Sequence, residues 1–258
     1  YLDIWTATIP AQIVRSFRQS QAWQAERTEL LEGDTAALVC SDEFCEYIFI
    51  QNTHVSNQVD EDVYYQCFEK TAVDLAKMGV TFDHVVRTWI YLDDINLSYP
   101  AFNEQRDRFY LEQGVFEKRV PASTGIGIST ECGPKMFCHV LAVRTLSDTV
   151  RIFPVESPLQ CSAMDYEVSF SRALEIEAPG YRRLLISGTA SIDAEGETVY
   201  SGSIRNQAEQ TAKVTEALLE SNEMMPQHII RFLSYTKRHN DCPLTDRFVT
   251  KWLPKNIE

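Results

Sequence analysis

Two stretches of the chain show the apolar spacing of a helix followed by the composition of a strand. In residues 66–79, apolar side chains recur where they would form one stripe along a helix, and Gly79 is suited to end it. Residues 84–92 are rich in β-branched and aromatic side chains, which predicts a strand. A shift of 144 residues repeats this pattern, with matches of Gln66 to Gln210, Thr71 to Thr215, Leu75 to Leu219, His84 to His228, Arg87 to Arg231 and Tyr91 to Tyr235. The chain is therefore predicted to contain a duplicated unit.

Further segments extend both copies. The predicted elements are strands at 47–50, 122–128, 136–143, 183–186 and 198–200, a strand at 228–235 from the repeat, a helix at 100–113 and a hairpin turn at 194–197. Strands and helices are mixed without strict βαβ alternation, so we predict an α+β fold with a mixed sheet.

The repeat also suggests how the chain divides. We expect an unassigned N-terminal segment at 1–39, a first domain at 40–146, a linker at 147–160 and a second domain at 161–258. Residue 258 corresponds to residue 114 of the first copy, so the second domain is expected to lack counterparts of the strands at 122–128 and 136–143.

Composition and charge narrow the class of protein. With 44% hydrophobic and 24% charged residues, the 258-residue chain has the composition of a soluble globular protein. No apolar run is long enough for a membrane span and no positively charged leader is seen, so we expect no membrane association and a cytoplasmic location. The formal charge of −13 argues against a nucleic-acid partner and against ribonuclease activity.

The cysteines favour reduced thiols over disulfides or metal ligands. Their number, seven, is odd, and they are spread through the chain. Neither Cys40 with Cys45 nor Cys132 with Cys138 and His139 has the spacing of a zinc site. We therefore expect buried thiols and no metal or other cofactor.

Several short motifs, in this order, resemble the RidA/YjgF family. Phe102–Tyr110 is similar to the family helix that bears a pocket Asn, here Asn103, and Pro121–Thr124 to the segment that usually carries a substrate-gripping Arg. Val168–Ala173 is similar to its substrate loop, and Ile186–Ser191 to its Ser-Gly strand end. The resemblance covers about residues 40–258 and implies two tandem RidA/YjgF-like (chorismate mutase-like) domains, each a mixed sheet with helices on one face.

Two motifs are similar to a narrower group. Ser157–Cys161, followed by Phe170–Ala173 and Ser187–Ser191, resembles two-domain relatives that include the chorismatases. Arg87–Asn96 is similar to the same group. In that group the acidic and thiol residues of the active site are expected in a stretch after Glu258.

The resemblance implies a small-molecule pocket and its lining. The candidate substrate-binding residues are Phe170, Arg172, Ser187, Gly188, Thr189, Asn103, Ser123 and Thr124. We expect backbone N–H groups of Ser187-Gly188-Thr189 to face a bound carboxylate or carbonyl, the alternative being a tight turn that needs the backbone freedom of Gly188. Ser123 stands where the family has its Arg, and His139 best matches its catalytic Glu, with Phe137 as the match if the register shifts. His139 is thus the candidate acid or base, with a core histidine as the alternative.

Three functions remain open. The family implies hydrolysis of an enamine or imine, a deaminase-like reaction in which the site holds a carboxylate, protonates carbon and admits water. The first alternative is a chorismatase-like cleavage of an enolpyruvyl ether, which also begins by protonating a vinylic carbon. The second alternative is a non-catalytic ligand-binding or scaffold protein. Because RidA-like domains are trimers, a homotrimer is the expected assembly.

Overall fold

The computed structural model describes residues 25–31, 35–55, 61–128, 134–162 and 169–253. The chain forms two compact units. Among these described residues, those within 25–155 and 169–188 belong to one unit, and those within 156–162 and 189–253 belong to the other. We refer to them as the sheet unit and the helical unit.

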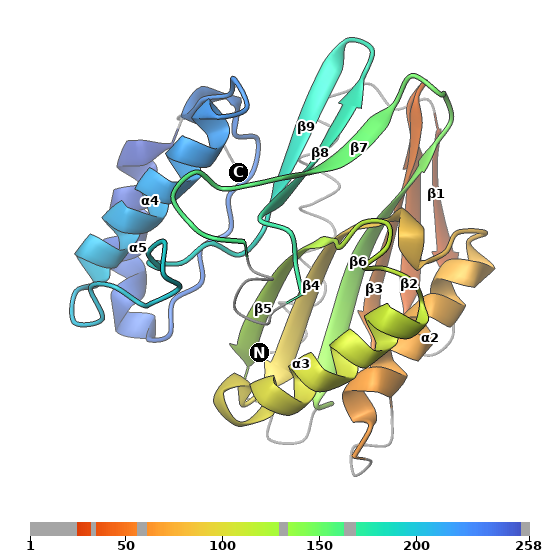
Figure 1. Ribbon diagram of the computed structural model, residues 1–258, viewed down its shortest axis with the longest axis horizontal. Coiled ribbons are helices and arrows are strands. Elements are labelled where there is room, and N and C mark those ends of the chain that lie inside the picture. Colours follow the sequence, from red (N-terminus) through yellow and green to blue (C-terminus); the bar gives the residue numbers. More distant parts are fainter. Residues whose placement is uncertain (1–24, 32–34, 56–60, 129–133, 163–168, 254–258) are drawn as a thin grey trace. The chain divides into compact units, whose positions relative to one another are not determined.

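A six-stranded mixed sheet forms the centre of the sheet unit (Figure 1). Its strands, in spatial order, are β1 (Ala25–Leu30), β2 (Ala36–Ser41), β3 (Cys45–Thr53), β6 (Met136–Thr145), β4 (Val85–Asp93) and β5 (Ala122–Ile128). All neighbours are antiparallel except β4 and β5, which are parallel. The predicted α+β class with a mixed sheet is confirmed. Strands β1 and β2 lie largely upstream of residue 40, where we expected the first domain to begin.

Helices α2 (Val63–Lys77) and α3 (Ile95–Glu112) cover one face of this sheet (Figure 1). Their aromatic side chains form the core between helices and sheet, and the Phe68 and Phe109 rings stack 5.4 Å apart. Gln105 fixes the packing of the two helices, because its Oε1 accepts hydrogen bonds from the Tyr64 and Tyr65 N–H groups at the start of α2. Helix α3 begins five residues before the predicted start at Pro100, which therefore lies inside the helix.

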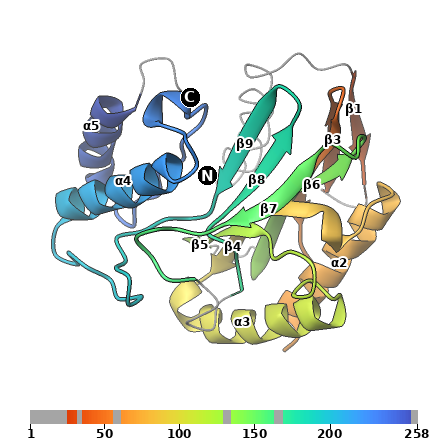
Figure 2. The ribbon, with the colours of Figure 1, turned by 45° about the horizontal axis from the view of Figure 1, so that its top comes forward.

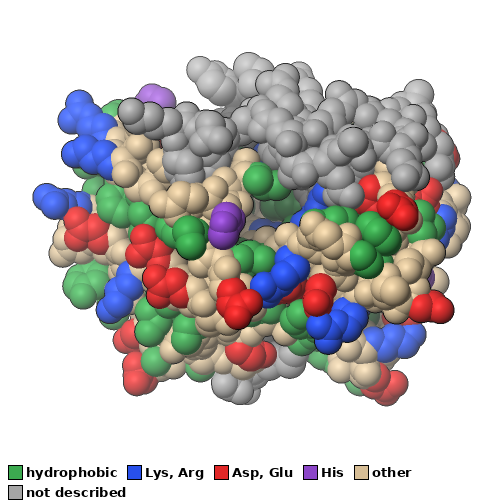
Figure 3. Space-filling view, turned by 90° about the horizontal axis from the view of Figure 1, so that it is seen from above, with side chains coloured by type: hydrophobic (Ala, Val, Ile, Leu, Met, Phe, Trp, Pro, Cys, Tyr) green, Lys and Arg blue, Asp and Glu red, His purple; other side chains and the backbone are tan. Residues whose placement is uncertain are grey.

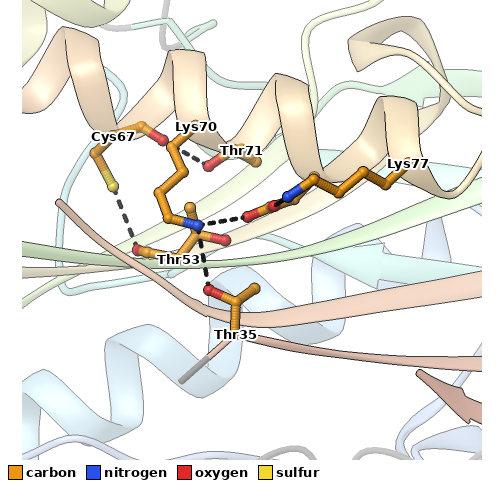
Figure 4. Close-up of polar contacts among 7 residues, drawn as sticks. Thr35, Thr53, Cys67, Lys70, Thr71 and Lys77 are labelled. Carbon is orange, nitrogen blue, oxygen red and sulfur yellow. Dashed lines mark hydrogen bonds and ion pairs between the residues drawn. The ribbon is translucent and has the colours of Figure 1, made fainter. Parts of the chain in front are cut away.

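A buried carboxylate on α2, Asp74, pairs with two lysines of the same helix, Lys70 and Lys77, which are labelled in Figure 4. The Asp74 side chain is fully buried, and one of its oxygens lies 3.0 Å from Lys70 Nζ and the other 3.0 Å from Lys77 Nζ. Lys70 also reaches Thr35 Oγ1, 3.5 Å away, next to the start of β2. Since a carboxylate is buried at acceptable cost only when it is paired, this arrangement fixes which face of α2 packs on the sheet.

A second, antiparallel sheet belongs to the same unit (Figure 2). It consists of β7 (Arg151–Val155), β8 (Ala173–Ala178) and β9 (Tyr181–Ile186), with β7 in the expected linker. Its link to the large sheet is polar: the Tyr47 and Tyr181 hydroxyl oxygens are 2.9 Å apart, and Tyr181 donates to Asp42 Oδ2 at 3.0 Å. The Arg183 guanidinium lies 4.9 Å from the Tyr47 ring centroid and 5.0 Å from that of Tyr181.

The helical unit contains α4 (Ile204–Glu220) and α5 (Cys242–Trp252). Trp252 joins the helices, because its indole N–H donates to Glu216 at 2.5 Å and its ring meets Phe232 edge-on. The hairpin turn predicted at 194–197 is present, with Asp193 N–H donating to the Glu197 carbonyl. The strand predicted at 198–200 is wrong: one isolated bridge joins Ile192 and Thr198, and Tyr200 has a positive φ of 60°.

The predicted repeat is visible in the way α2 and α4 end. Gly79 and Glu223, 144 residues apart, both follow their helix in the left-handed conformation. Beyond them lie two short 3₁₀ helices, η1 (Phe82–His84) and η3 (Pro226–His228), each closed by a histidine. The matched hydrogen bonds are Val80 N–H to Leu75 and Met224 N–H to Leu219 at the helix ends, and Thr81 N–H to His84 Nδ1 and Met225 N–H to His228 Nδ1 in the 3₁₀ turns.

The likeness stops where the second strand should begin. Strand β4 is formed between β5 and β6 and is fully paired. Residues 229–236 follow η3 as β4 follows η1, but they form no strand with any described part of the chain. The prediction of a strand at 228–235 is therefore wrong, because strand propensity does not make a strand without a partner.

Candidate functional site

The face of the large sheet opposite α2 and α3 carries a row of polar and aromatic side chains. Along β4, Ile90 and Leu92 belong to the helix-side core, so Trp89 and Tyr91 project to the other face. In the sheet register Thr124 of β5 and His139 of β6 flank Trp89 on either side. The row therefore contains two of the predicted site residues, Thr124 and His139. Trp89, which lies between them, was not selected from the sequence.

His139 is buried in this row. Its side chain is 5% exposed, and its ring meets Tyr91 edge-on with the centroids 5.3 Å apart. Burial lowers the pKa of His139 to about 4, because the charged imidazolium loses its hydration. At neutral pH the ring is neutral, so it can accept a proton but holds none to give as an imidazolium. Its assignment as the catalytic group stays a prediction.

Arg87 adds positive charge beside the same row. Its guanidinium donates to Thr124 Oγ1 and, at 2.7 Å, to the Thr88 carbonyl, and it lies 4.8 Å from the centroid of the Trp89 ring. Arg87 is 6% exposed, so its charge is largely removed from water. A buried guanidinium held in a fixed position favours an anionic neighbour or ligand on this face. The sequence signals for Arg87 were its repeat at Arg231, each three residues after a histidine, and its place at the start of the Arg87–Asn96 motif.

The Ser-Gly strand end packs directly against β5. Ser187 N–H donates to the Arg172 carbonyl at 2.9 Å and Gly188 N–H donates to the Ser123 carbonyl at 2.9 Å. The Ser187 hydroxyl accepts from Ser123 N–H at 2.8 Å and donates to the Ser171 carbonyl. The N–H groups of Ser187 and Gly188 are thus used within the protein, so the expectation that they face a ligand is corrected for these two residues.

Gly188 is required because the backbone at this position lies close to Thr124 of β5. A Cβ atom at Gly188 would lie 3.0 Å from Thr124 Cγ2 and 3.2 Å from Thr124 Oγ1. Its φ is not in the left-handed region, in contrast to Gly79. The backbone freedom of glycine, which we considered as the alternative, is therefore not the reason for this residue. Glycine is needed here because β5 and the chain at the end of β9 are in close contact.

The remaining predicted residues divide between different surroundings. Arg172 is 6% exposed, with its guanidinium 5.4 Å from the centroid of the partly buried Phe170 ring. The Ser123 hydroxyl accepts from Thr88 Oγ1 at 2.7 Å, and Thr88 pairs with Val140 of the helix-side core. Asn103 is half-buried on α3, and Thr189 belongs to the helical unit. The structure therefore brings together Ser123, Thr124, Arg172, Ser187 and Gly188, and leaves Asn103 away from the Trp89 row.

Other kinds of site receive no support from the described residues. Among them, no three His, Cys, Asp or Glu side chains are grouped as metal ligands. Cys40, Cys45 and Cys138 are buried free thiols, and burial raises the pKa of Cys138 to about 12, while Cys132 lies outside the described residues. No described helix is long and apolar enough to cross a membrane. On the face shown in Figure 3, acidic and basic side chains are interspersed.

Comparison with known proteins finds one matching family model and several solved structures of similar fold. Residues 21–142 match the model of the N-terminal region of FkbO/Hyg5-like chorismatases. A chorismatase crystal structure has a similar fold, with a TM-score of 0.68 and 20% identity over 90% of this chain and 72% of that chain. Matches to E. coli YjgF (16% identity over 38% of this chain and 80% of that chain, TM-score 0.34) and to E. coli TdcF with bound serine (13% over 41% and 85%, TM-score 0.33) are weaker. No curated protein matches the chain.

Proposed function

We propose that the chain acts as a chorismatase-like enzyme that cleaves the enolpyruvyl ether of chorismate. The observation that carries this proposal is the match of residues 21–142 to the FkbO/Hyg5-like chorismatase N-terminal region. The chorismatase fold extends this likeness over 90% of the chain. These two findings favour ether cleavage over the deaminase reaction that the RidA resemblance first implied.

The reaction is a hydrolysis that starts with a proton. Protonation of the terminal vinylic carbon gives an oxocarbenium ion, to which water adds at the carbon bearing the ether oxygen. The water proton is released, the hemiketal breaks its bond to the ring oxygen, and pyruvate and a ring alcohol result. An enamine follows the same course with nitrogen in place of the ether oxygen, which is why one fold serves both reactions.

The buried face of the large sheet supports an anionic substrate of this kind. Arg87 and Arg172 are both 6% exposed and bring guanidinium groups to the sheet unit. Guanidinium groups in fixed positions suit the carboxylates of chorismate. A neutral His139, with its pKa near 4, does not supply the initial proton in this account. We assign His139 to the buried part of this face, next to Trp89. We expect the proton donor to be an acidic residue elsewhere.

A comparison of two substrates tests the proposal. The full-length protein that contains residues 1–258 is incubated with chorismate, and pyruvate is measured with lactate dehydrogenase. In a parallel assay, 2-aminoacrylate is generated from serine by a dehydratase and its decay is followed by semicarbazide trapping. Pyruvate release from chorismate, with no acceleration of 2-aminoacrylate decay, supports the proposal. Acceleration of that decay without cleavage of chorismate would instead support the deaminase-like function. The absence of both activities would favour a binding protein.

A further inference from the structure

Three polar atoms on one side of α3 are buried and make no hydrogen bond. They are Asn103 Oδ1, one terminal nitrogen of Arg106 (Nη2) and the Tyr110 hydroxyl. Spacings of three and four residues put these side chains next to one another on a helix. The Arg106 side chain is only 3% exposed and Tyr110 is fully buried. A buried polar atom of this kind destabilises the folded protein unless a partner is supplied.

The neighbours of Arg106 contact only part of its guanidinium group. Its Nε lies 3.2 Å from Asp107 Oδ1, and its central carbon lies 5.2 Å from the centroid of the Phe102 ring. Asp107 is 37% exposed and approaches the Nε side only. The Nη2 donor is therefore left for something else.

The sheet opposite carries polar side chains near Arg106. Helix α3 connects the parallel strands β4 and β5, so it runs back along β4. From Ile95 to Arg106 it advances roughly 16 Å, which β4 covers in about five residues, so Arg106 lies level with Thr88. On this face Thr88 bonds to Ser123 at 2.7 Å, and the next residue of β5 on the same face is Gly125, beside which lies the Ile95 side chain.

The three atoms define a pattern of donors and acceptors. Arg106 and Tyr110 are donors, because burial raises the pKa of Tyr110 and keeps its hydroxyl protonated, although nearby Arg106 partly opposes this shift. Asn103 Oδ1 is an acceptor and requires a donor from its partner. A simple halide offers no such proton, whereas a planar oxyanion with one hydroxyl group offers acceptors to Arg106 and Tyr110 and a donor to Asn103.

We propose that Arg106, Tyr110 and Asn103 bind a small oxyanion that carries one hydroxyl group, of the size and shape of bicarbonate. The site lies on the helix side of the large sheet, whereas the Trp89 row lies on the other side. It does not depend on the proposed enzymatic function. An anion there neutralises a buried cation and fixes α3 on β4 and β5, so it stabilises the folded protein.

Thermal unfolding with three sodium salts tests this site. Melting temperatures are measured at mildly alkaline pH in chloride, formate and bicarbonate at equal ionic strength. Bicarbonate is expected to raise the melting temperature by at least about 2 °C over chloride, with formate between them because it lacks the hydroxyl group. Arg106→Met and Tyr110→Phe should abolish or reduce this rise. Arg108→Met, on the exposed side of α3 where Arg108 pairs with Asp62 at 3.0 Å, should keep it.

The outcomes separate the parts of the proposal. No rise over chloride in the unmodified protein, or an equal rise in Tyr110→Phe, overturns the site. An effect of formate as large as that of bicarbonate overturns the pairing of a hydroxyl with Asn103. If Arg106→Met does not fold, Tyr110→Phe carries the test alone, because it keeps the ring contacts with Phe68, Phe82 and Phe116.

Discussion

Gly79 and Glu223 have the same backbone conformation 144 residues apart, with φ angles of 70° and 58°. Each follows the end of a helix, and each precedes a residue whose N–H returns to the helix, Val80 to Leu75 and Met224 to Leu219. Glycine adopts this conformation without strain, whereas for a residue with a Cβ atom it costs about 1 kcal/mol. The two helix ends thus have the same backbone shape, although only the first has the residue that suits it.

Replacing Glu223 with Gly is therefore expected to stabilise the protein. The free energy of unfolding should rise by about 1 kcal/mol, because the strain at φ 58° is removed. Urea denaturation followed by circular dichroism measures the change. Glu220→Gly, in the last turn of α4, is the matched control and should destabilise by a similar amount. A loss of stability in Glu223→Gly contradicts the equivalence with Gly79.

Gly188→Ala tests the contact between β9 and β5. The new Cβ would meet Thr124 Cγ2 at 3.0 Å, so we expect a loss of about 1–3 kcal/mol in unfolding free energy. Thr124→Ser removes Cγ2 but keeps the hydroxyl that accepts from Arg87. In the double variant, the smaller serine side chain leaves room for the new methyl group, and most of the loss should be recovered. Additive losses in this double-mutant cycle would show that Thr124 is not what excludes a side chain at 188.

The buried His139 predicts a pH-dependent stability. Its pKa near 4 in the folded protein lies below the value of about 6.5 in an unfolded chain, so folding favours the neutral ring. This contribution is complete above pH ~6.5 and is lost as the pH falls towards 4, by up to about 3 kcal/mol. Burial also lowers the pKa of His84, which acts in the same direction.

Comparing variants isolates this effect. His139→Gln removes the titration, so the fall in unfolding free energy between pH 7 and pH 4.5 should be smaller than in the unmodified protein. His84→Gln serves as control and should change this fall much less. Equal pH profiles for the unmodified protein and His139→Gln would mean that the histidine is hydrated in solution.

The sequence predicts those parts of the fold that depend on local pattern. The apolar stripe in residues 66–79 and the β-branched run at 84–92 correspond to α2 and β4. These were predictable because the periodicity of a helix or a strand depends on residues that are close together in the sequence. The same composition at 228–235 fails to form a strand, since pairing depends on segments far away in the chain. The burial of Asp74 was not predicted, because an acidic residue on a helix usually faces water. Its lysines at positions 70 and 77 were the available signal.

The candidate site was predictable to a similar extent. The motifs Ser187-Gly188 and Ser123-Thr124 were both selected from the sequence but were assigned to different domains, whereas in the structure they bond through Gly188 N–H and the Ser123 carbonyl. The direction of those N–H groups was not predictable, because it depends on how closely β9 approaches β5. The stacking of Arg87 on Trp89 was also hidden, because it follows from which face of β4 each side chain takes in the sheet.

The fate of the ether oxygen during chorismate cleavage tests the central claim most directly. The full-length protein is given chorismate in water enriched in oxygen-18, and the ring product is analysed by mass spectrometry while pyruvate is quantified enzymatically. Protonation of the vinylic carbon leaves the original oxygen on the ring, so the account predicts pyruvate together with a ring alcohol that contains no oxygen-18. Intact chorismate, or a ring product that carries oxygen-18, would contradict it.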